Sequence, residues 1–268
     1  MFVSSPFKHQ SCLLGNVTSI DRHRQIADAV RGAGQLSVAE LAGLTGTSDM
    51  TIRRDLEILA EQGVLERYRG GARTLLLRGQ EPPFALRAIE GLETKQRIAA
   101  AVADMIADGE AVVLDSGTTC LEVARLLRDR RVTVMALSLQ AANALADAPA
   151  ANLLLAGGRP RPGEGALTGP LARASLQSLR FDTAVIGCCG LTAEHGLTAY
   201  DLDDADIKRA AISSSCRVIA VTEAAKLFHT ALAFVSPVTA LHALVTDASA
   251  PDDEVQAISA AGVTVRQV

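Results

Sequence analysis

Apolar residues recur at helical spacing in three consecutive segments near the N-terminus, residues 22–33, 37–44 and 48–62. A helix turns once every 3.6 residues, so this spacing places the apolar side chains of each segment on one face. The connection over residues 45–48 is only four residues long. The pattern predicts three short helices, of which the last two form a helix-turn-helix.

The third predicted helix has a capped start and an exposed, charged face. Ser48 is a favourable N-cap, and Gly63 follows the last turn as a C-terminal stop. Arginine binds phosphates and pairs with guanine through two hydrogen bonds, so the outward residues are candidates for DNA contact. A solvated surface helix would carry the same charges. The candidates are Ser48, Met50, Thr51, Arg53 and Arg54.

Two short stretches with strand character, residues 64–68 and 72–75, follow this helix. The segment 69–71 between them can turn with positive φ at either glycine. Three helices followed by a hairpin predict a winged helix. Residues 67–80 hold four arginines and no acidic residue, so the wing carries local positive charge. Its candidate DNA contacts are Arg67, Arg69 and Arg73.

From Lys95 onward, short apolar runs alternate with amphipathic segments. Such alternation predicts an α/β domain with an open, mostly parallel sheet, whose ligands bind at the carboxyl ends of the strands. The expected strands are residues 111–114, 132–137, 153–155, 183–186, 218–221, 243–246 and 263–266. The expected helices are residues 96–106, 120–128, 140–147, 170–178, 204–214 and 252–260.

The pattern divides the chain into four parts. Residues 1–20 are expected to be a disordered leader, 21–77 a winged helix-turn-helix DNA-binding domain, 78–94 a linker and 95–268 the α/β domain. Within the linker, Pro82-Pro83 bars regular helix, and a short polar connection is expected after it.

Polar and glycine residues follow several of the predicted strands. Asp115, Ser116, Gly117, Thr118 and Thr119 follow the first strand and open a helix, where free N–H groups suit a phosphate. An ordinary capped turn would look the same. Three more glycines at strand ends, Gly157, Gly158 and Gly187, and Lys226 after a strand are further candidates for the ligand site. Asp204 and Lys208 form an i,i+4 pair, which by itself is ordinary helix chemistry.

Composition excludes other classes of protein. The chain of 268 residues is 49% hydrophobic with a formal net charge of −4, and residues 21–80 hold nine basic against eight acidic residues, so DNA binding depends on where the arginines lie. No apolar run approaches the length of a membrane span, and a cytoplasmic location is expected. Five cysteines without a CxxC and scattered histidines predict neither disulfides nor a metal site.

The N-terminal motifs resemble the DeoR family of bacterial transcriptional regulators. The resemblance rests on VAELA at residues 38–42, TIRRDL at 51–56, GVL at 63–65 and RGGA at 69–72. Further matches cover nearly everything from Pro83 to the C-terminus, including DSGTT at 115–119, LTGP at 167–170 and KRA at 208–210.

The resemblance implies a sensor domain similar to ribose-5-phosphate isomerase that binds a phosphorylated sugar or related metabolite. It assigns the phosphate to the loop 115–119 and Lys226, and sugar hydroxyls to Asp115, Asp204 and Lys208. Ser138 is assigned to the same site. One departure is Leu137, where the family usually has Asn, so the polar part of the effector at that point differs or is missing.

The sequence therefore predicts a transcriptional regulator, most simply a repressor of a carbohydrate operon, acting as a homo-dimer or homo-tetramer on double-stranded operator DNA without a cofactor. A rival interpretation is an isomerase-like enzyme with an appended DNA-binding domain. Those isomerases carry acids where this chain has Ile186 and Cys189, and an isoleucine cannot transfer a proton. A redox switch through Cys188 and Cys189 is a weaker interpretation, because no basic residue flanks the pair.

Overall fold

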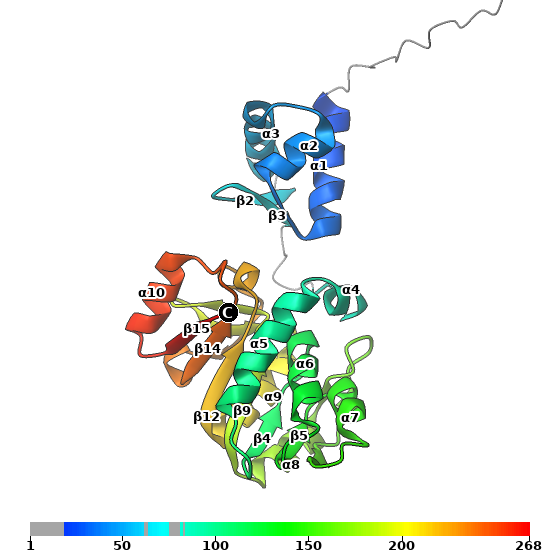
Figure 1. Ribbon diagram of the computed structural model, residues 1–268, viewed down its shortest axis with the longest axis vertical. Helices are drawn as coiled ribbons and strands as arrows, with labels where there is room; N and C mark the ends of the chain where they lie inside the picture. Colours follow the sequence, from blue (N-terminus) through cyan, green and yellow to red (C-terminus); the bar gives the residue numbers. More distant parts are fainter. Residues whose placement is uncertain (1–18, 62–63, 75–80, 83) are drawn as a thin grey trace, which may run out of the picture. The chain divides into compact units, whose positions relative to one another are not determined.

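The computed structural model describes residues 19–61, 64–74, 81–82 and 84–268. By its internal contacts the chain divides into two compact units, residues 1–75 and 76–268. The predicted leader up to residue 18 and the helix stop at Gly63 lie outside the described residues, whereas Ser19 and Ile20 already belong to the first helix. Figure 1 shows the elements of both units.

The N-terminal unit is a winged helix, as predicted. Its elements are α1 (Ser19–Ala33), β1 (Gln35–Ser37), α2 (Val38–Thr45), α3 (Asp49–Glu61), β2 (Leu65–Tyr68) and β3 (Gly71–Thr74). The strand β1 was not predicted. It is three residues long and pairs antiparallel with β3, so its only support comes from residues more than thirty positions away, which no local pattern reveals.

Local capping and a small core fix the helix-turn-helix. The Ser37 hydroxyl accepts the Glu40 N–H while the Glu40 carboxylate accepts the Ser37 N–H, a capping box that starts α2. Gly46 ends α2 in the left-handed conformation, with φ of 66°. Ile52 and other apolar residues of all three helices are buried against one another.

The wing turn uses its two glycines differently. Gly70 has φ of 113°, the positive value that the turn requires, whereas Gly71 lies in β3 with an ordinary φ. A Cβ at Gly71 would lie 2.2 Å from the carbonyl oxygen of Leu36 in β1. Gly71 is therefore needed for the close approach of two strands, and Gly70 for the turn.

Asp55, inside the TIRRDL motif, is a structural residue that the sequence analysis missed. It is 4% exposed, and its carboxylate accepts two hydrogen bonds from the Arg22 guanidinium, at 2.6 and 3.1 Å, and lies 2.9 Å from His23 Nε2. Burial raises the pKa of Asp55, but the hydrogen bonds and charges of Arg22 and His23 outweigh it and lower that pKa. The ion pair ties α3 to α1.

Asp55→Ala is expected to lower the stability of the N-terminal unit by roughly 2–4 kcal/mol, because Arg22 would keep a largely buried charge without its partner. Hydrogen exchange of the α1 and α3 amides in the full chain measures this loss. Glu57→Ala is the control, since the Glu57 side chain is 57% exposed in its pair with Arg67, and a change below about 1 kcal/mol is expected. Equal losses in the two variants would contradict the role given to Asp55.

The C-terminal unit is built around a seven-stranded sheet in the order β15-β14-β12-β9-β4-β5-β6, with every neighbouring pair parallel. This confirms the predicted parallel α/β architecture. Its elements are α4 (Phe84–Ile89), α5 (Leu92–Met105), β4 (Ala111–Leu114), α6 (Thr118–Leu127), β5 (Thr133–Ala136), α7 (Leu139–Leu145), β6 (Asn152–Leu155), β7 (Arg159–Pro160), β8 (Leu167–Thr168), α8 (Pro170–Gln177), β9 (Phe181–Gly187), β10 (Gly190–Thr192), β11 (Gly196–Ala199), α9 (Leu202–Ser213), β12 (Ser215–Val221), η1 (Ala224–Lys226), β13 (Ala233–Ser236), η2 (Val238–Ala240), β14 (Ala243–Thr246), α10 (Asp252–Ala260) and β15 (Thr264–Gln267).

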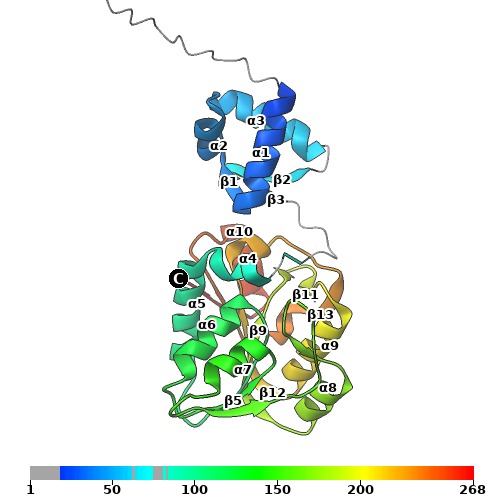
Figure 2. The ribbon, with the colours of Figure 1, turned by 90° about the vertical axis from the view of Figure 1, so that its right-hand side faces the viewer.

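Helices cover both faces of this sheet. Figure 2 shows α5, α6 and α7 on one side and α8 and α9 on the other. Strand alternation supplies both cores: Val112 and Leu114 face the α5–α7 core, while Val113 between them faces the α8–α9 core. Strands buried on both faces explain why the sequence showed continuous apolar runs.

The structure differs from the prediction in its short elements. Residues 84–94, expected to be a polar connection, form α4 and the first turn of α5. Residues 190–192, 196–199 and 233–236 form a small antiparallel sheet, β10-β11-β13, which was not predicted. These strands have three or four residues each, too few for a periodic signal.

The strand order reverses beside β4. From β4 the chain adds β5 and β6 on one side, then returns to place β9 on the other side. Such a reversal opens a crevice beyond the carboxyl ends of the two central strands, here β4 and β9. Asp115 follows β4 and Gly187 ends β9, so both predicted residues lie at this point.

Candidate functional site

The helix α3 presents the residues predicted for DNA contact. Ser48 caps the helix by accepting the Thr51 N–H at 3.3 Å. Met50 is 63% exposed, Arg53 and Arg54 are exposed, and no described carboxylate forms an ion pair with either arginine. Two guanidinium groups at consecutive positions of α3 are therefore available to an anionic partner.

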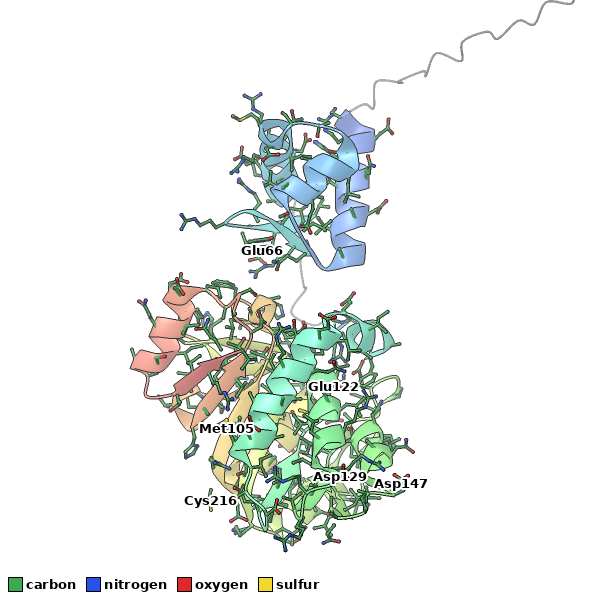
Figure 3. The ribbon with its side chains drawn as sticks, viewed as in Figure 1. Glu66, Met105, Glu122, Asp129, Asp147 and Cys216 are labelled. Carbon is green, nitrogen blue, oxygen red and sulfur yellow. The ribbon has the colours of Figure 1, made fainter. Side chains whose placement is uncertain are left out.

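The three wing arginines differ in their partners. Arg69 is exposed next to the turn. Arg67 lies 2.8 Å from Glu57 of α3, and Arg73 makes two hydrogen bonds with Glu66 of the neighbouring strand β2. Figure 3 labels Glu66 beside this strand. Glu66 and Glu57 offset part of the positive charge that the run of arginines suggested, so the charge available to DNA is concentrated on α3 and Arg69.

Asp115 is the central charged residue of the crevice. It is 1% exposed, and its carboxylate accepts the Gly187 N–H at 2.9 Å and a hydrogen bond from the Lys208 ammonium. Lys208 also donates to the Gly187 carbonyl at 3.1 Å and lies 3.5 Å from Asp204. The structure thus brings together four predicted residues from three separate elements, β4, β9 and α9.

The charges of this group depend on one another. Burial opposes the charged form of Lys208, but attraction to Asp115 and Asp204 outweighs it and raises the pKa of Lys208 well above its ordinary value. Burial raises the pKa of Asp204 to about 6, against an ordinary 3.8. Asp204 therefore takes up a proton as the pH falls toward 6, whereas the Lys208 ammonium keeps its charge.

The raised pKa of Asp204 determines how its contribution to the free energy of unfolding changes with pH. Between pH 4 and 6 the folded chain holds a proton on Asp204 that the unfolded chain has lost, so this contribution decreases as pH rises through that window. The stability of the wild type minus that of Asp204→Asn should therefore increase as pH is lowered from 7 to 5, by up to about 1.4 kcal/mol per pH unit. Urea denaturation of both proteins measures it, and a difference independent of pH would contradict the assignment.

The loop 116–119 leads into α6. Gly117 precedes the helix with φ of 107°, and no described side chain caps the first turn. Thr118 and Thr119 are buried, and Ser116 is half-buried. The N-terminus of α6 therefore keeps N–H groups without a side-chain acceptor, an arrangement that favours an anion.

The remaining predicted residues occupy different places. Lys226 ends η1, beyond the carboxyl end of β12, and forms no ion pair with any described carboxylate. Ser138 is 2% exposed and caps α7 by accepting the Ala141 N–H. Leu137 beside it is 1% exposed and packs in the core.

Gly157 and Gly158 follow the edge strand β6, two strands away from β4. A Cβ on Gly158 would lie 2.4 Å from the Thr168 carbonyl oxygen, so this glycine permits close packing of the backbone. Gly157 has φ of 71° and open space around it. No described backbone hydrogen bond joins either glycine to the group around Asp115.

Four charged residues near the crevice were not predicted. Glu81 and Arg87 come from the segment assigned above to the linker, and Arg161 and Glu164 from the loop between β7 and β8; together they form a ring of ion pairs. The i,i+3 spacing of Arg161 and Glu164 was the only local signal. Lys95, 2% exposed, donates to the Arg87 and Glu90 carbonyls and so caps the C-terminal end of α4.

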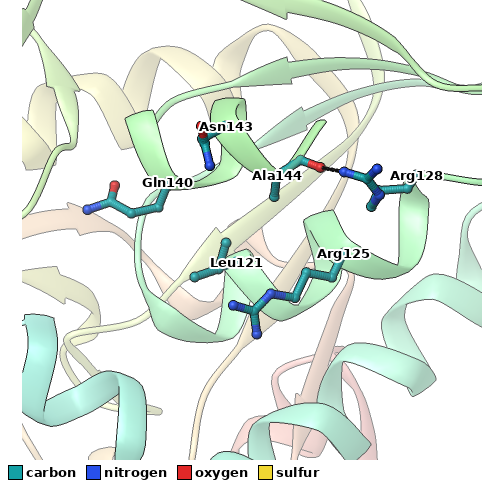
Figure 4. A pocket seen from close by; sticks show the side chains of 6 residues that line it. All are labelled: Leu121, Arg125, Arg128, Gln140, Asn143 and Ala144. Carbon is teal, nitrogen blue, oxygen red and sulfur yellow. Dashed lines mark hydrogen bonds between the residues drawn. The ribbon is translucent and has the colours of Figure 1, made fainter. Parts of the chain in front are cut away.

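A separate groove lies between α6 and α7, with a volume of about 370 Å³ (Figure 4). Its lining residues are Leu121, Arg125, Arg128, Gln140, Asn143 and Ala144. Arg128 pairs with Asp147 at 2.7 Å, and Arg125 with Glu122 at 2.6 Å. The groove contains none of the residues predicted for the effector, and its arginines already have partners.

The chain matches known proteins over both units. Residues 22–75 match the DeoR-like helix-turn-helix domain, and residues 90–248 match the DeoR C-terminal sensor domain. The glycerol-3-phosphate regulon repressor of Escherichia coli K12 is 31% identical over 239 residues, which are 89% of this chain and 94% of that protein.

The chain belongs to the DeoR family of transcriptional regulators.

A second curated relative agrees with this assignment. The HTH-type transcriptional regulator GlpR of Haloferax volcanii is 31% identical to this DeoR-family chain over 246 residues, 91% of this chain and 96% of that protein. Among solved structures, ribose 5-phosphate isomerase A of Methanocaldococcus jannaschii matches 52% of this chain and 55% of its own at 14% identity and a TM-score of 0.39. A likeness of that degree says nothing about catalysis.

Three side chains of this DeoR-family regulator bear on the enzyme and redox interpretations. Ile186, where the isomerases carry an acid, is fully buried in the core. Burial raises the pKa of Cys189 to about 11 and that of Cys188 to about 12, so both thiols are protonated at neutral pH and poorly nucleophilic. No described helix is both long and apolar enough to cross a bilayer.

Proposed function

We propose that this DeoR-family regulator represses a carbohydrate operon and that a phosphorylated sugar or related metabolite, bound at the crevice, changes its affinity for the operator. One observation carries the proposal. Lys226 is a cation without a carboxylate partner among the described residues, its charge acts on the Cys120 pKa together with those of Asp115 and Lys208, and the N-terminus of α6 has no side-chain cap. Both features favour a bound phosphate.

Within this proposal the crevice residues have separate tasks. The first turn of α6 and Lys226 bind the phosphate. Asp115 and Asp204 accept hydrogen bonds from sugar hydroxyls, and Lys208 holds the two carboxylates in place. Because Leu137 is buried in the core, it offers the sugar no hydrogen bond. The name of the E. coli relative, a glycerol-3-phosphate regulon repressor, supports a phosphorylated metabolite.

In this proposal the N-terminal unit binds the operator. Arg53, Arg54 and Arg69 are its main cationic contacts, with Met50 and Thr51 beside them on α3. Operators for helix-turn-helix proteins are commonly two-fold symmetric, so the proposed species is a homo-dimer or homo-tetramer acting in the cytoplasm, where it meets DNA. An effector that binds two arrangements of the protein unequally would shift operator affinity by the ratio of its two affinities.

The alternative, an isomerase-like enzyme, would need a proton-transferring group beside the sugar. Conversion of the bound sugar phosphate is not expected, because Ile186 cannot transfer a proton and the Cys189 thiol is held protonated.

A thermal-shift screen against sugar phosphates tests the proposed effector class. At least one sugar phosphate should raise the melting temperature where the parent sugar does not, because the phosphate supplies most of the charge interaction. A turnover assay on each stabilising compound should recover it unchanged. No stabilisation by any phosphorylated metabolite would end the proposal, and product formation would favour the enzyme.

A further inference from the structure

Four charged side chains form a closed ring at the carboxyl edge of the sheet. Arg87 Nη2 lies 3.0 Å from Glu81 Oε1 and also contacts Glu164, while Arg161 Nη2 contacts the second oxygen of Glu81 and lies 3.9 Å from Glu164. Their side chains are between 13% and 19% exposed. The Glu81 carboxylate thus bridges two guanidinium groups, one oxygen to each.

That bridging carboxylate has the geometry of a bound anion. Guanidinium groups present paired donors that match the oxygens of carboxylates and phosphates, and two of them around one anion carry a charge of +2. Glu81 and Glu164 together balance this charge, but Glu81 offers each guanidinium group only one oxygen, whereas a phosphate group presents more acceptor oxygens to the two arginines. Glu81 therefore holds a position for which a phosphate group can compete.

The ring lies next to the crevice. Burial is the main cause of the raised pKa of Asp204, and the charges of Arg161 and Glu81 are close enough to contribute to it. In turn, the carboxylates of Asp204 and Asp201 act on the pKa of Arg161. A ligand that reaches Asp204 is therefore close to Arg161, which shares the Glu81 carboxylate with Arg87.

The ring also fixes the segment that follows the DNA-binding unit in the chain. Arg87 belongs to α4, donates to the Pro82 carbonyl at 2.8 Å and stacks over Phe84. Lys95 caps the same helix from α5. Two ion pairs connect this segment to the loop between β7 and β8. Glu81 pairs with Arg161, and Arg87 pairs with Glu164.

We propose that Arg87 and Arg161 form a second anion-binding subsite, occupied by Glu81 in the effector-free protein, and that a phosphate group displaces Glu81 and releases residues 81–90. The inference rests on the proposed function in one respect: it assigns the subsite to the same effector. Because α6 and Lys226 already take one phosphate, the effector class becomes a sugar bisphosphate or a phosphorylated sugar with another anionic group. Release of this segment is the step that transmits effector binding along the chain toward the DNA-binding unit.

Hydrogen exchange of the α4 amides in the full chain tests the subsite with inorganic phosphate as probe and sodium acetate at equal ionic strength as control. Phosphate should accelerate exchange in the wild type where acetate does not. Glu81→Gln should show fast exchange of the α4 amides without phosphate, because a neutral amide no longer forms ion pairs with Arg87 and Arg161. It should also bind phosphate roughly tenfold more tightly by calorimetry, because no carboxylate competes with the anion.

Arg161→Gln should lose the response to phosphate, whereas Arg159→Gln should keep it, since Arg159 is 77% exposed and pairs only with Asp203 among the described residues. Wild-type phosphate dependence in both Glu81→Gln and Arg161→Gln would overturn the subsite, and so would an equal response to acetate. Because Arg161→Gln could unfold the loop, the gain expected for Glu81→Gln keeps the test decisive.

The two proposals fail in different ways. A sugar phosphate that loses affinity in Lys226→Ala but not in Arg161→Gln would leave the proposed function standing and overturn the subsite. If no sugar phosphate binds the wild type, the proposed function fails. Release of α4 by inorganic phosphate that depends on Arg161 would still support the anion subsite.

Discussion

Replacing Arg54 with alanine is expected to weaken operator binding by roughly 10- to 100-fold, the effect of losing one bidentate contact with a base. Arg54 is exposed on the first half of α3, has no carboxylate partner among the described residues and lies next to Arg53. If Arg54 binds a phosphate instead, the slope of log K against log salt should fall by about 0.9. Fluorescence anisotropy at several salt concentrations measures both quantities, on a duplex that the wild type selects from a random pool.

Arg131→Ala is the matched control for Arg54→Ala. It removes the same charge from the sensor unit, where the Arg131 side chain is 83% exposed beside Asp108. If Arg131→Ala weakens binding as much as Arg54→Ala, the effect would come from total charge. Unchanged affinity and salt slope in Arg54→Ala would remove this residue from the DNA interface.

Lys226→Ala is expected to weaken effector binding by roughly 10- to 100-fold, because the phosphate would lose its one charged partner outside α6. Operator binding without effector should stay within about twofold, since Lys226 has no described ion pair whose loss would unfold the unit. Calorimetry with a sugar phosphate from the thermal-shift screen measures the first effect, and anisotropy the second. Lys226→Arg retains the charge and should retain most of the affinity.

A substitution of Asp115 cannot test effector binding in the same way. It is 1% exposed and is a partner of the buried Lys208. Asp115→Ala would leave the Lys208 ammonium without this partner and would cost roughly 3–5 kcal/mol of stability, so lost binding could not be separated from lost folding.

Wild-type calorimetric affinity for the sugar phosphate in Lys226→Ala would exclude Lys226 from the site.

The long periodic elements were predictable from the sequence because their signals are local. The helices of the N-terminal unit and the strands of the large sheet follow the apolar pattern. The strand ends gave Asp115 and Gly187, the family resemblance gave Lys208, and the fold brings the three together. Residues that the parallel sheet places at one edge can be recognised before their distances are known.

The rest depended on contacts between distant residues. Glu81 and Arg161 are 80 positions apart, and neither belongs to a motif. Asp55 gives no local sign that Arg22, 33 positions earlier, is its partner. The strand β1 exists only because β3 lies beside it. Gly158 packs closely against the Thr168 carbonyl, and the sequence cannot distinguish such packing from the approach of a ligand, because both require the absence of a Cβ.

Operator anisotropy in the presence of a bound sugar phosphate tests the central claim, that an anionic metabolite sensed by the C-terminal unit controls DNA binding by the N-terminal unit without being converted. Adding the metabolite should change the operator Kd by roughly 5- to 150-fold, with the compound recovered intact afterwards. An operator Kd that stays constant while the metabolite saturates its site, or steady conversion of the metabolite to a product, would contradict the account.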